Sequence, residues 1–167
     1  MKIGRITISD RASAGIYQDR SGPEIEKILG VFFGGTVEFE SVIVPDETDL
    51  IAAELRKFAD MLQCDMVFTT GGTGVSARDV TPEATRLVLE KELPGFGEIM
   101  RIQSFATVPT AILSRATAGT RGRTLIVNLP GKPSAVRECL EILAPAICEG
   151  VAHLRGEDPH AATPSKK

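Results

Sequence analysis

The chain has 167 residues, of which 43% are hydrophobic and 25% are charged, and its formal net charge is −3. This composition is typical of one soluble globular domain, and the dispersed basic residues argue against a nucleic-acid-binding surface. No segment approaches the roughly 20 consecutive apolar residues of a membrane span, so we expect a cytoplasmic protein without a membrane anchor.

The predicted elements alternate between strands and helices. The strands are short, rich in β-branched residues and bounded by Gly, Pro or Asp, whereas the helices show an apolar face. In chain order we expect a strand over residues 2–10, a strand over 37–44, a helix over 51–62, a strand over 65–70, a helix from residue 81, strands over 110–114 and 123–128, and a helix over 133–153.

Local signals define two of the helices in more detail. Thr81 is suited to be an N-cap, with Pro82 in the first turn and Glu83 placed favourably against the helix dipole. In the last helix, Pro145 removes a backbone donor, so we expect a bend or a break there.

Alternating strands and helices with nearly apolar central strands indicate an α/β fold. We expect a three-layer sandwich in which helices flank a mostly parallel central sheet. Residues 1–154 form a single domain in this prediction, and residues 155–167, which lack apolar periodicity, form a flexible tail.

The three cysteines and two histidines are not arranged as a metal site. Cys64, Cys139 and Cys148 lack the spacing of zinc ligands, and both histidines lie near the C-terminus. We therefore expect buried free thiols, and neither a histidine-based metal site nor a Ser-His-Asp triad.

Polar residues and glycines follow the predicted strands. Parallel strands point their carboxyl ends toward one edge of the sheet, where α/β proteins bind ligands. Each stretch alone could be only a turn, but together they predict a site. They are Asp10, Arg11 and Ser13, then Pro45 and Asp46, then residues 71–79, then Ser114 and Arg115, and finally Asn128, Pro130 and Gly131.

The glycine-rich stretch TTGGTGVSARD, residues 69–79, resembles two phosphate-binding motifs only in part. It follows a strand and formally matches the dinucleotide-binding glycine pattern. In that motif, however, the helix begins within the loop and an acid at the end of a following strand contacts the ribose, and this sequence has neither feature. It also lacks the lysine of a nucleotide-triphosphate loop. What remains is an open turn whose backbone N–H groups could hold a phosphate, with nearby threonine and serine hydroxyls as donors.

Asp46 and Asp79 need a role beside such a phosphate. At an effective dielectric near 20, a carboxylate about 4 Å from a unit negative charge costs about 4 kcal/mol. A divalent cation turns this repulsion into attraction, and Mg²⁺ favours carboxylate and phosphate oxygens. The residues therefore predict magnesium-assisted phosphate chemistry at the strand ends, with no defined substrate.

Several motifs resemble those of the MogA/MoaB-type molybdopterin-binding family. They occur in the family's order over roughly residues 3–150, and the first of them is most similar to the branch that adenylylates molybdopterin. The motifs are SDRASAGIYQD, VPDE, TTGGTG, RDVTPEA, PGFGEIMR, AILSRATAG and NLPGKPSA.

The resemblance implies a reaction and its participants. The terminal phosphate of molybdopterin would attack the α-phosphorus of ATP in the presence of Mg²⁺, giving adenylylated molybdopterin and pyrophosphate. The product could serve molybdenum or tungsten insertion. The resemblance also implies a homotrimer and a transient contact with the enzyme that inserts molybdate.

The family's functional residues map onto defined positions of this sequence. Asp46 and Asp79 match the two catalytic aspartates, and both are candidate Mg²⁺ ligands. The phosphate-binding loop maps to Thr70, Gly71, Gly72, Thr73 and Gly74. The positions that match the nucleotide and pterin pocket are Ser9, Asp10, Arg11, Ser114, Arg115, Asn128, Pro130 and Gly131.

Two further hypotheses stay open at this point. A catalytically silent molybdopterin-binding or scaffold module would have the same fold, because fold does not determine function. A nicotinamide-dependent oxidoreductase would account for the glycine pattern and would show no dependence on magnesium. The presence of both Asp46 and Asp79 favours catalysis, since a binding module gains nothing from carboxylates beside phosphates.

Overall fold

The computed structural model describes residues 1–35 and 37–157. One sheet has the strand order β2-β1-β3-β6-β5-β4. The strands are β1 (Lys2–Ile8), β2 (Glu38–Val44), β3 (Met66–Thr70), β4 (Lys91–Glu92), β5 (Ala118–Arg121) and β6 (Thr124–Leu129). The helical elements are α1 (Asp10–Ser13), α2 (Ser21–Phe33), α3 (Thr48–Arg56), the π-helical turn η1 (Lys57–Met61), α4 (Thr81–Arg86), α5 (Pro94–Phe105), the 3₁₀ turn η2 (Pro109–Leu113) and α6 (Pro133–Arg155).

The sheet is mostly parallel, as predicted. Strands β2, β1, β3 and β6 run in one direction, while β5 is antiparallel to β6 and β4 is antiparallel to β5. In the register, Thr7 is paired with Thr70, and Thr70 is paired with Leu129. The carboxyl ends of the central strands therefore meet at one edge of the sheet.

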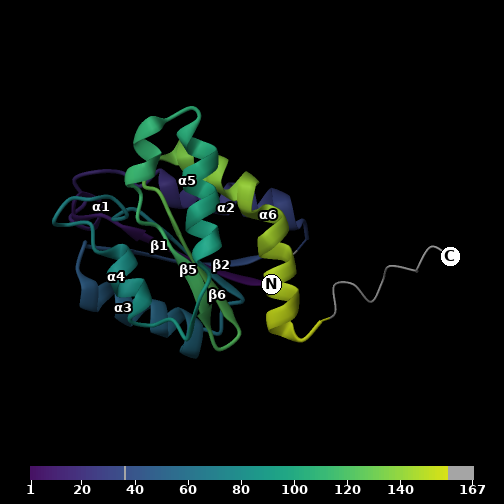
Figure 1. Ribbon diagram of the computed structural model, residues 1–167. Helices are drawn as coiled ribbons and strands as arrows, with labels where there is room; N and C mark the ends of the chain where they lie inside the picture. Colours follow the sequence, from purple (N-terminus) through teal and green to yellow (C-terminus); the bar gives the residue numbers. More distant parts are fainter. Residues whose placement is uncertain (36, 158–167) are drawn as a thin grey trace.

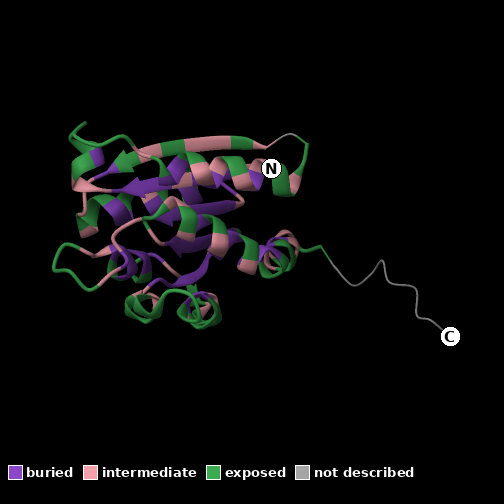
Figure 2. Ribbon diagram, turned by 90° about the horizontal axis from the view of Figure 1, so that it is seen from above, coloured by how far each residue is buried: buried purple, intermediate pink, exposed green. Residues whose placement is uncertain are grey.

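Helices cover both faces of the sheet, which confirms the three-layer prediction. Met66 and Phe68 of β3 face one buried cluster, together with residues of α2, α5 and α6. Val67 points to the opposite face, into a cluster with α3 and α4. Figure 1 shows α2, α5 and α6 on one side of the sheet and α3 and α4 on the other, and Figure 2 shows the buried residues concentrated between these layers. This arrangement follows from the alternation of side chains along a strand.

The predicted strand over residues 110–114 is wrong. This segment forms the 3₁₀ turn η2, which Pro109 opens. Ile112 is 62% exposed and Leu113 is 51% exposed, so the apolar pattern that resembled a strand does not reflect burial. The sheet is completed instead by β5 and β4, whose short, glycine-containing or charged sequences carry little strand signal.

The predicted helices are present, with three differences. The amphipathic helix over residues 51–62 is α3, which is continued by η1. The last helix is α6, which runs unbroken through Pro145. Thr81 is the first residue of α4 and not its N-cap, because its hydroxyl donates to Gly71 O at 2.9 Å instead of capping the helix. Helix α2 was not among the predicted elements, although Ile25 and Leu29 have helical spacing and are buried.

The predicted tail begins too early. Arg155 is the last residue of α6 and forms an ion pair with Asp65 at 3.0 Å, and Gly156 ends the helix in the left-handed conformation. The remainder of the predicted tail, residues 158–167, lies outside the described residues. Within the described part of the chain, no helix combines the length and the apolar character needed to cross a membrane.

The cysteines differ in exposure, and this leads to a test by thiol labelling. All three are free; Cys64 and Cys139 are buried as predicted, whereas Cys148 is exposed. Burial raises the pKa of the Cys64 thiol to about 11 and that of Cys139 to about 12. Because the thiolate is the reactive form, we expect an aromatic disulfide reagent near neutral pH to modify Cys148 rapidly and the other two only after unfolding. Rapid modification of all three thiols in the folded chain would contradict this expectation.

Candidate active site

The carboxyl edge of the sheet brings together most of the predicted residues. Asp10 follows β1, Asp46 follows β2, and the segment from Gly71 to Asp79 follows β3. The end of β6 joins them, because the Thr70 hydroxyl donates to Pro130 O at 2.8 Å. Residues far apart in the sequence therefore form one continuous surface at this edge.

A tight turn at Gly71 and Gly72 forms the floor of this surface. Both residues have positive φ, of 100° and 62° respectively, which disfavours any residue with a side chain. A Cβ on Gly71 would lie 2.2 Å from the backbone oxygen of Ile8, and a Cβ on Gly131 would lie 3.3 Å from the Gly71 Cα. The turn therefore packs closely between β1 and the segment after β6, and only glycine fits there.

Asp46 borders this turn and is held by a reciprocal pair of hydrogen bonds. The Asp10 amide donates to Asp46 Oδ2 at 2.9 Å, and the Asp46 amide donates to Asp10 Oδ1 at 3.0 Å. Arg78 donates to both Asp10 carboxylate oxygens, at 3.0 Å and 2.8 Å. A Cβ on Gly72 would lie 2.9 Å from Asp46 Oδ1, so the carboxylate faces the glycine turn.

Asp79 borders the same turn one glycine further along. A Cβ on Gly74 would lie 2.9 Å from Asp79 Oδ2, and the Ser76 amide donates to that oxygen at 2.8 Å. The absent side chains of Gly72 and Gly74 therefore leave space beside both predicted catalytic acids.

The carboxylates influence each other electrostatically. Partial burial raises the pKa of Asp46 above its ordinary value, and the negative charges of Asp10 and Asp79 raise it further. By contrast, the hydrogen bonds from Arg78 hold the pKa of Asp10 below its ordinary value. A site with this excess of negative charge favours a cation, or the protonated form of Asp46.

This pKa shift predicts how the stability of the protein depends on pH. Below the ordinary aspartate value of 3.8 the Asp46 carboxyl is protonated in both the folded and unfolded chain. As the pH rises from that value toward the higher pKa that Asp46 has in the folded chain, only the unfolded chain loses the proton. The free energy of unfolding therefore falls over this window. We expect Asp46→Asn to unfold at higher urea concentration than the native chain near neutral pH, and this gain to vanish below the window. Asp49→Asn, at an exposed acid in the first turn of α3, should show no such gain.

Arg115 contacts the loop that carries Asp79. Its backbone amide donates to Thr73 O at 2.8 Å, and its guanidinium donates to Gly74 O at 2.7 Å and to Asp79 O at 2.6 Å. It also forms an ion pair with Glu83. In this structure the Arg115 side chain therefore binds protein groups; its predicted contact with a substrate stays a prediction.

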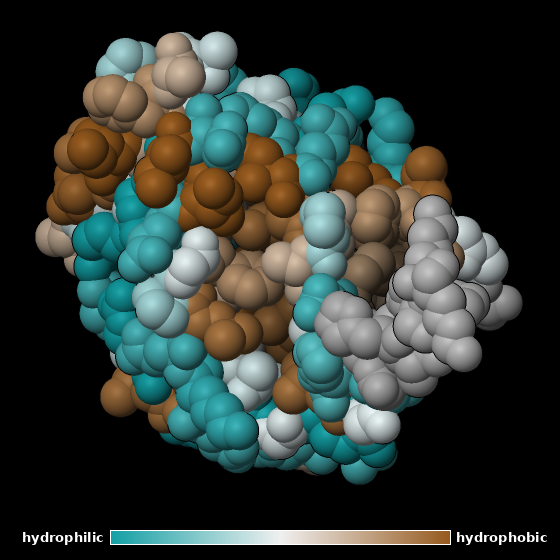
Figure 3. Space-filling model, turned by 45° about the vertical axis from the view of Figure 1, so that its right-hand side comes forward, coloured by the Kyte–Doolittle hydropathy of each residue, from teal (hydrophilic) through white to brown (hydrophobic). Residues whose placement is uncertain are grey.

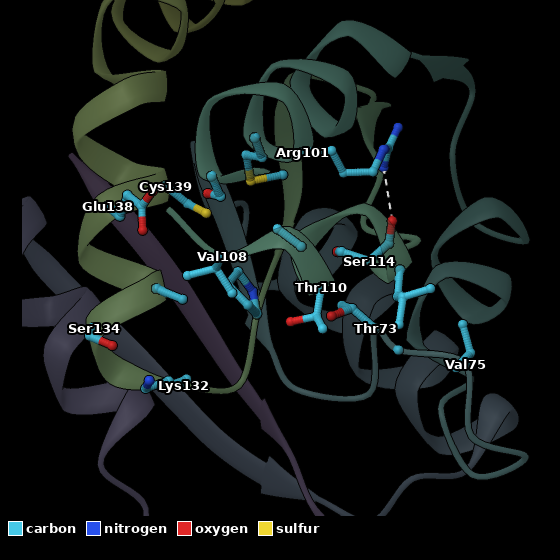
Figure 4. A pocket seen from close by; sticks show the side chains of 17 residues that line it. Thr73, Val75, Arg101, Val108, Thr110, Ser114, Lys132, Ser134, Glu138 and Cys139 are labelled. Carbon is cyan, nitrogen blue, oxygen red and sulfur yellow. Dashed lines mark hydrogen bonds between the residues drawn. The ribbon is translucent and has the colours of Figure 1, made fainter. Parts of the chain in front are cut away.

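A mostly apolar cavity of about 380 Å³ adjoins the glycine turn (Figure 4). It lies between the loop after β3, α5, η2 and the start of α6, and its size is within the usual range of small-molecule sites. Gly74 connects the two regions, because it lines the cavity and also lies against the Asp79 carboxylate. The polar residues around the cavity include Thr73, Arg101, Ser104, Ser114, Lys132 and Glu138.

Comparison with known proteins identifies the family. The family model described as a probable molybdopterin binding domain matches residues 4–149. The chain belongs to this family. It is 56% identical over 145 residues to a molybdopterin adenylyltransferase of Helicobacter pylori strain J99, covering 87% of this chain and 82% of that protein. It is 46% identical over 153 residues to the molybdopterin adenylyltransferase of Escherichia coli K12, covering 92% of this chain and 78% of that protein.

A solved structure agrees with this assignment. The molybdopterin biosynthesis enzyme MoaB of Thermus thermophilus superposes with a TM-score of 0.85 at 42% identity, over 93% of this chain and 97% of that one. The family resemblance found in the sequence motifs and the fold class predicted from the alternation of strands and helices are both confirmed.

Within this molybdopterin-binding domain, three predicted pocket residues have other contacts. Asn128 lies inside β6 and is fully buried; its amide donates to the Thr69 and Thr85 hydroxyls, at 3.0 Å and 2.9 Å, and accepts from the Thr117 amide. Ser9 caps α1 by accepting from the Ala12 amide. The exposed Arg11 lies over the Tyr17 ring, 5.2 Å from its centroid.

Several residues of the site were not predicted from the sequence. Arg78 was included only as part of residues 71–79 and was given no role of its own, although it donates to both Asp10 carboxylate oxygens. Thr81 and Thr85 are separated by one helical turn. The Thr81 hydroxyl donates to Gly71 O in the glycine turn, and the Thr85 hydroxyl accepts from the Asn128 amide in β6. No local pattern singles out Ser104, Glu138 and Cys139, because they reach the cavity only through the packing of α5 and α6.

Proposed function

We propose that this protein is a Mg²⁺-dependent molybdopterin adenylyltransferase. An oxygen of the terminal molybdopterin phosphate attacks the α-phosphorus of ATP, the bond between that phosphorus and the bridging oxygen breaks, and pyrophosphate leaves. The substrate itself supplies the nucleophile, so the protein has to position the phosphates and neutralise their charge. This agrees with a site in which the carboxylates of Asp10, Asp46 and Asp79 gather beside the glycine turn.

The observation that carries the proposal is that Asp46 and Asp79 border one glycine turn, in a chain 56% identical to an adenylyltransferase. Two anionic substrates cannot gather beside these acids without a cation. Within the described residues, no three His, Cys, Asp or Glu side chains form a preformed metal site. This suits Mg²⁺, which takes one or two carboxylates and completes its shell with substrate phosphates and water.

Asp46 and Asp79 would hold the cation in this proposal. When bound, Mg²⁺ would neutralise the charge of the transferring phosphates. The Gly71 amide donates to Leu129 O, so the amides that follow it in the turn would orient the phosphate chain, and Gly72 and Gly74 would allow its close approach. The apolar cavity beside Gly74 would accept a planar ring system of one of the substrates and keep water from it.

The test is transfer of the adenylyl group itself. ATP labelled at the α-phosphorus is incubated with the native chain, molybdopterin and Mg²⁺. We expect the label to appear in adenylylated molybdopterin, together with one pyrophosphate per transfer and only when all three components are present. Binding of molybdopterin without adenylyl transfer would favour the alternative that the protein is a molybdopterin-binding module. Binding of a nicotinamide cofactor without a magnesium requirement would favour an oxidoreductase.

We also propose that the chain forms the homotrimer implied by its family. Several large apolar side chains of α5 and of the segment that follows it are exposed, including Ile102 at 66% and Ile112 at 62%. Apolar surface also gathers on the side of the molecule that α5 and α6 form (Figure 3). Light scattering on the purified protein would test the trimer, and a monomer at micromolar concentration would contradict it.

A further inference from the structure

The segment from Gly74 to Asp79 is an exposed loop, and its own side chains reach a distant strand end through the pair of hydrogen bonds from Arg78 to Asp10. Its central residues are exposed, with Val75 at 67%. Three hydrogen bonds close it internally: the Ser76 amide donates to Asp79 Oδ2 at 2.8 Å, the Asp79 amide donates to Ser76 O at 3.0 Å, and the Arg78 amide donates to Ser76 Oγ at 3.4 Å. A loop of this kind belongs to the least stable parts of a fold unless something outside it holds its ends.

Arg115 joins the two ends of that loop. Nε donates to Gly74 O at 2.7 Å, at the start of the loop, and Nη2 donates to Asp79 O at 2.6 Å, at its end. The third guanidinium nitrogen, Nη1, pairs with Glu83 in α4. The backbone amide of Arg115 donates to Thr73 O, directly before the loop. One side chain thus connects both loop ends to α4.

We propose that Arg115 is a positioning residue that holds the Asp79 carboxylate at the mouth of the site, and that it does not bind substrate. The role assigned to Asp79 rests on the proposed function. All three nitrogens of the guanidinium already donate to protein oxygens, and one of its neighbours is an acid, which makes it a poor ligand for an incoming phosphate. The planar arrangement of its donors is what allows one side chain to reach three acceptors.

This role differs from direct anion binding in its response to substitution. Lysine keeps the positive charge but has a single nitrogen, so it cannot connect Gly74, Asp79 and Glu83 together. If Arg115 acts through geometry, Arg115→Lys should behave like Arg115→Met. If it acts through charge on a substrate, lysine should restore most of the activity.

The experiment measures both variants by steady-state kinetics and by amide hydrogen exchange of the full chain. We expect kcat to fall by about 100-fold in each, because small displacements of a catalytic group have effects of that size. We expect KM for ATP and molybdopterin to stay within about twofold, as for a group without ground-state contacts. The Ser76 and Asp79 amides should exchange at least about tenfold faster, because the loop opens more often.

Two further variants make the test specific. Arg86→Met removes a neighbouring arginine that lies 3.7 Å from Glu92 and donates nothing to the loop, so it should leave kcat and exchange unchanged. Combining Arg115→Met with Asp79→Asn should cost little beyond Asp79→Asn alone, because the two residues act as a unit.

The results would separate this proposal from the proposed function. Faster loop exchange in both Arg115 variants of a chain that shows no adenylyl transfer would support the loop-holding role and refute the function. Recovery of kcat with lysine, a rise in KM with unchanged exchange, or additive effects in the double variant would each overturn the positioning role. If Arg115→Met fails to fold, Arg115→Lys retains the charge and side-chain length and still decides the question.

Discussion

Asp46→Asn and Asp79→Asn should each lower molybdopterin-dependent pyrophosphate release by at least about 100-fold, or about 2.7 kcal/mol of activation free energy. Both carboxylates border the glycine turn, so each is placed to supply negative charge there. Asparagine retains an oxygen that can accept the amide of Asp10 or of Ser76, so the substitution removes mainly the charge. Initial rates of pyrophosphate release at saturating ATP and Mg²⁺ would measure the effect.

The matched control for the two acids is Asp49→Asn. Asp49 lies three residues after Asp46, is exposed and is in the first turn of α3, so its loss should leave the rate within about twofold. Retention of more than about a tenth of the native rate by both Asp46→Asn and Asp79→Asn would refute their catalytic role. Raising the Mg²⁺ concentration should partly restore the variants if the acids act as metal ligands.

Gly71→Ala should be the most damaging small substitution in the site. The residue has a φ of 100°, and the new Cβ would lie 2.2 Å from the backbone oxygen of Ile8, which belongs to the central strand β1 and has little freedom to move. The unfavourable backbone conformation alone costs about 1–3 kcal/mol, and relief of the clash requires the glycine turn to move. We therefore expect lower stability in urea and lower activity together.

Gly30→Ala provides the opposite result with the same chemical change. Gly30 lies inside α2, and a Cβ there would meet nothing within 4 Å. Alanine in a helix is favoured over glycine by about 0.5–1 kcal/mol, so this variant should be slightly more stable than the native chain and fully active. Equal urea midpoints for Gly71→Ala and the native chain would contradict the structural explanation of the turn.

The sequence by itself determined the features that depend on local pattern. Side-chain periodicity indicated the parallel strands β1, β2, β3 and β6 and the helices α3, α4 and α6. Because parallel strands end at one edge, the polar residues after them predicted a site before any contact was known. The ordered motifs led to the family, since long motifs in a defined order are specific where a single glycine pattern is not.

Only the tertiary structure decided how these residues work together. The hydrogen bond from Asp10 to Asp46 spans 36 residues of sequence, and that from Arg115 to Gly74 spans 41. Arg115 and Asn128 looked like ligand-binding residues because they follow or end apparent strands. In the folded chain Arg115 donates to Gly74 O and Asp79 O, and the Asn128 amide donates to the Thr69 and Thr85 hydroxyls, while their predicted contacts with substrate stay predictions.

The misassigned segments have the same physical cause. The apolar pattern over residues 110–114 suggested burial, but whether a side chain is buried depends on which elements pack over it, and η2 lies at the surface with Ile112 and Leu113 exposed. Thr81 has the sequence of an N-cap, yet its hydroxyl binds Gly71 O because the fold places that carbonyl within reach. Residue type and spacing specify what a side chain can do, and long-range packing selects which of those contacts it makes.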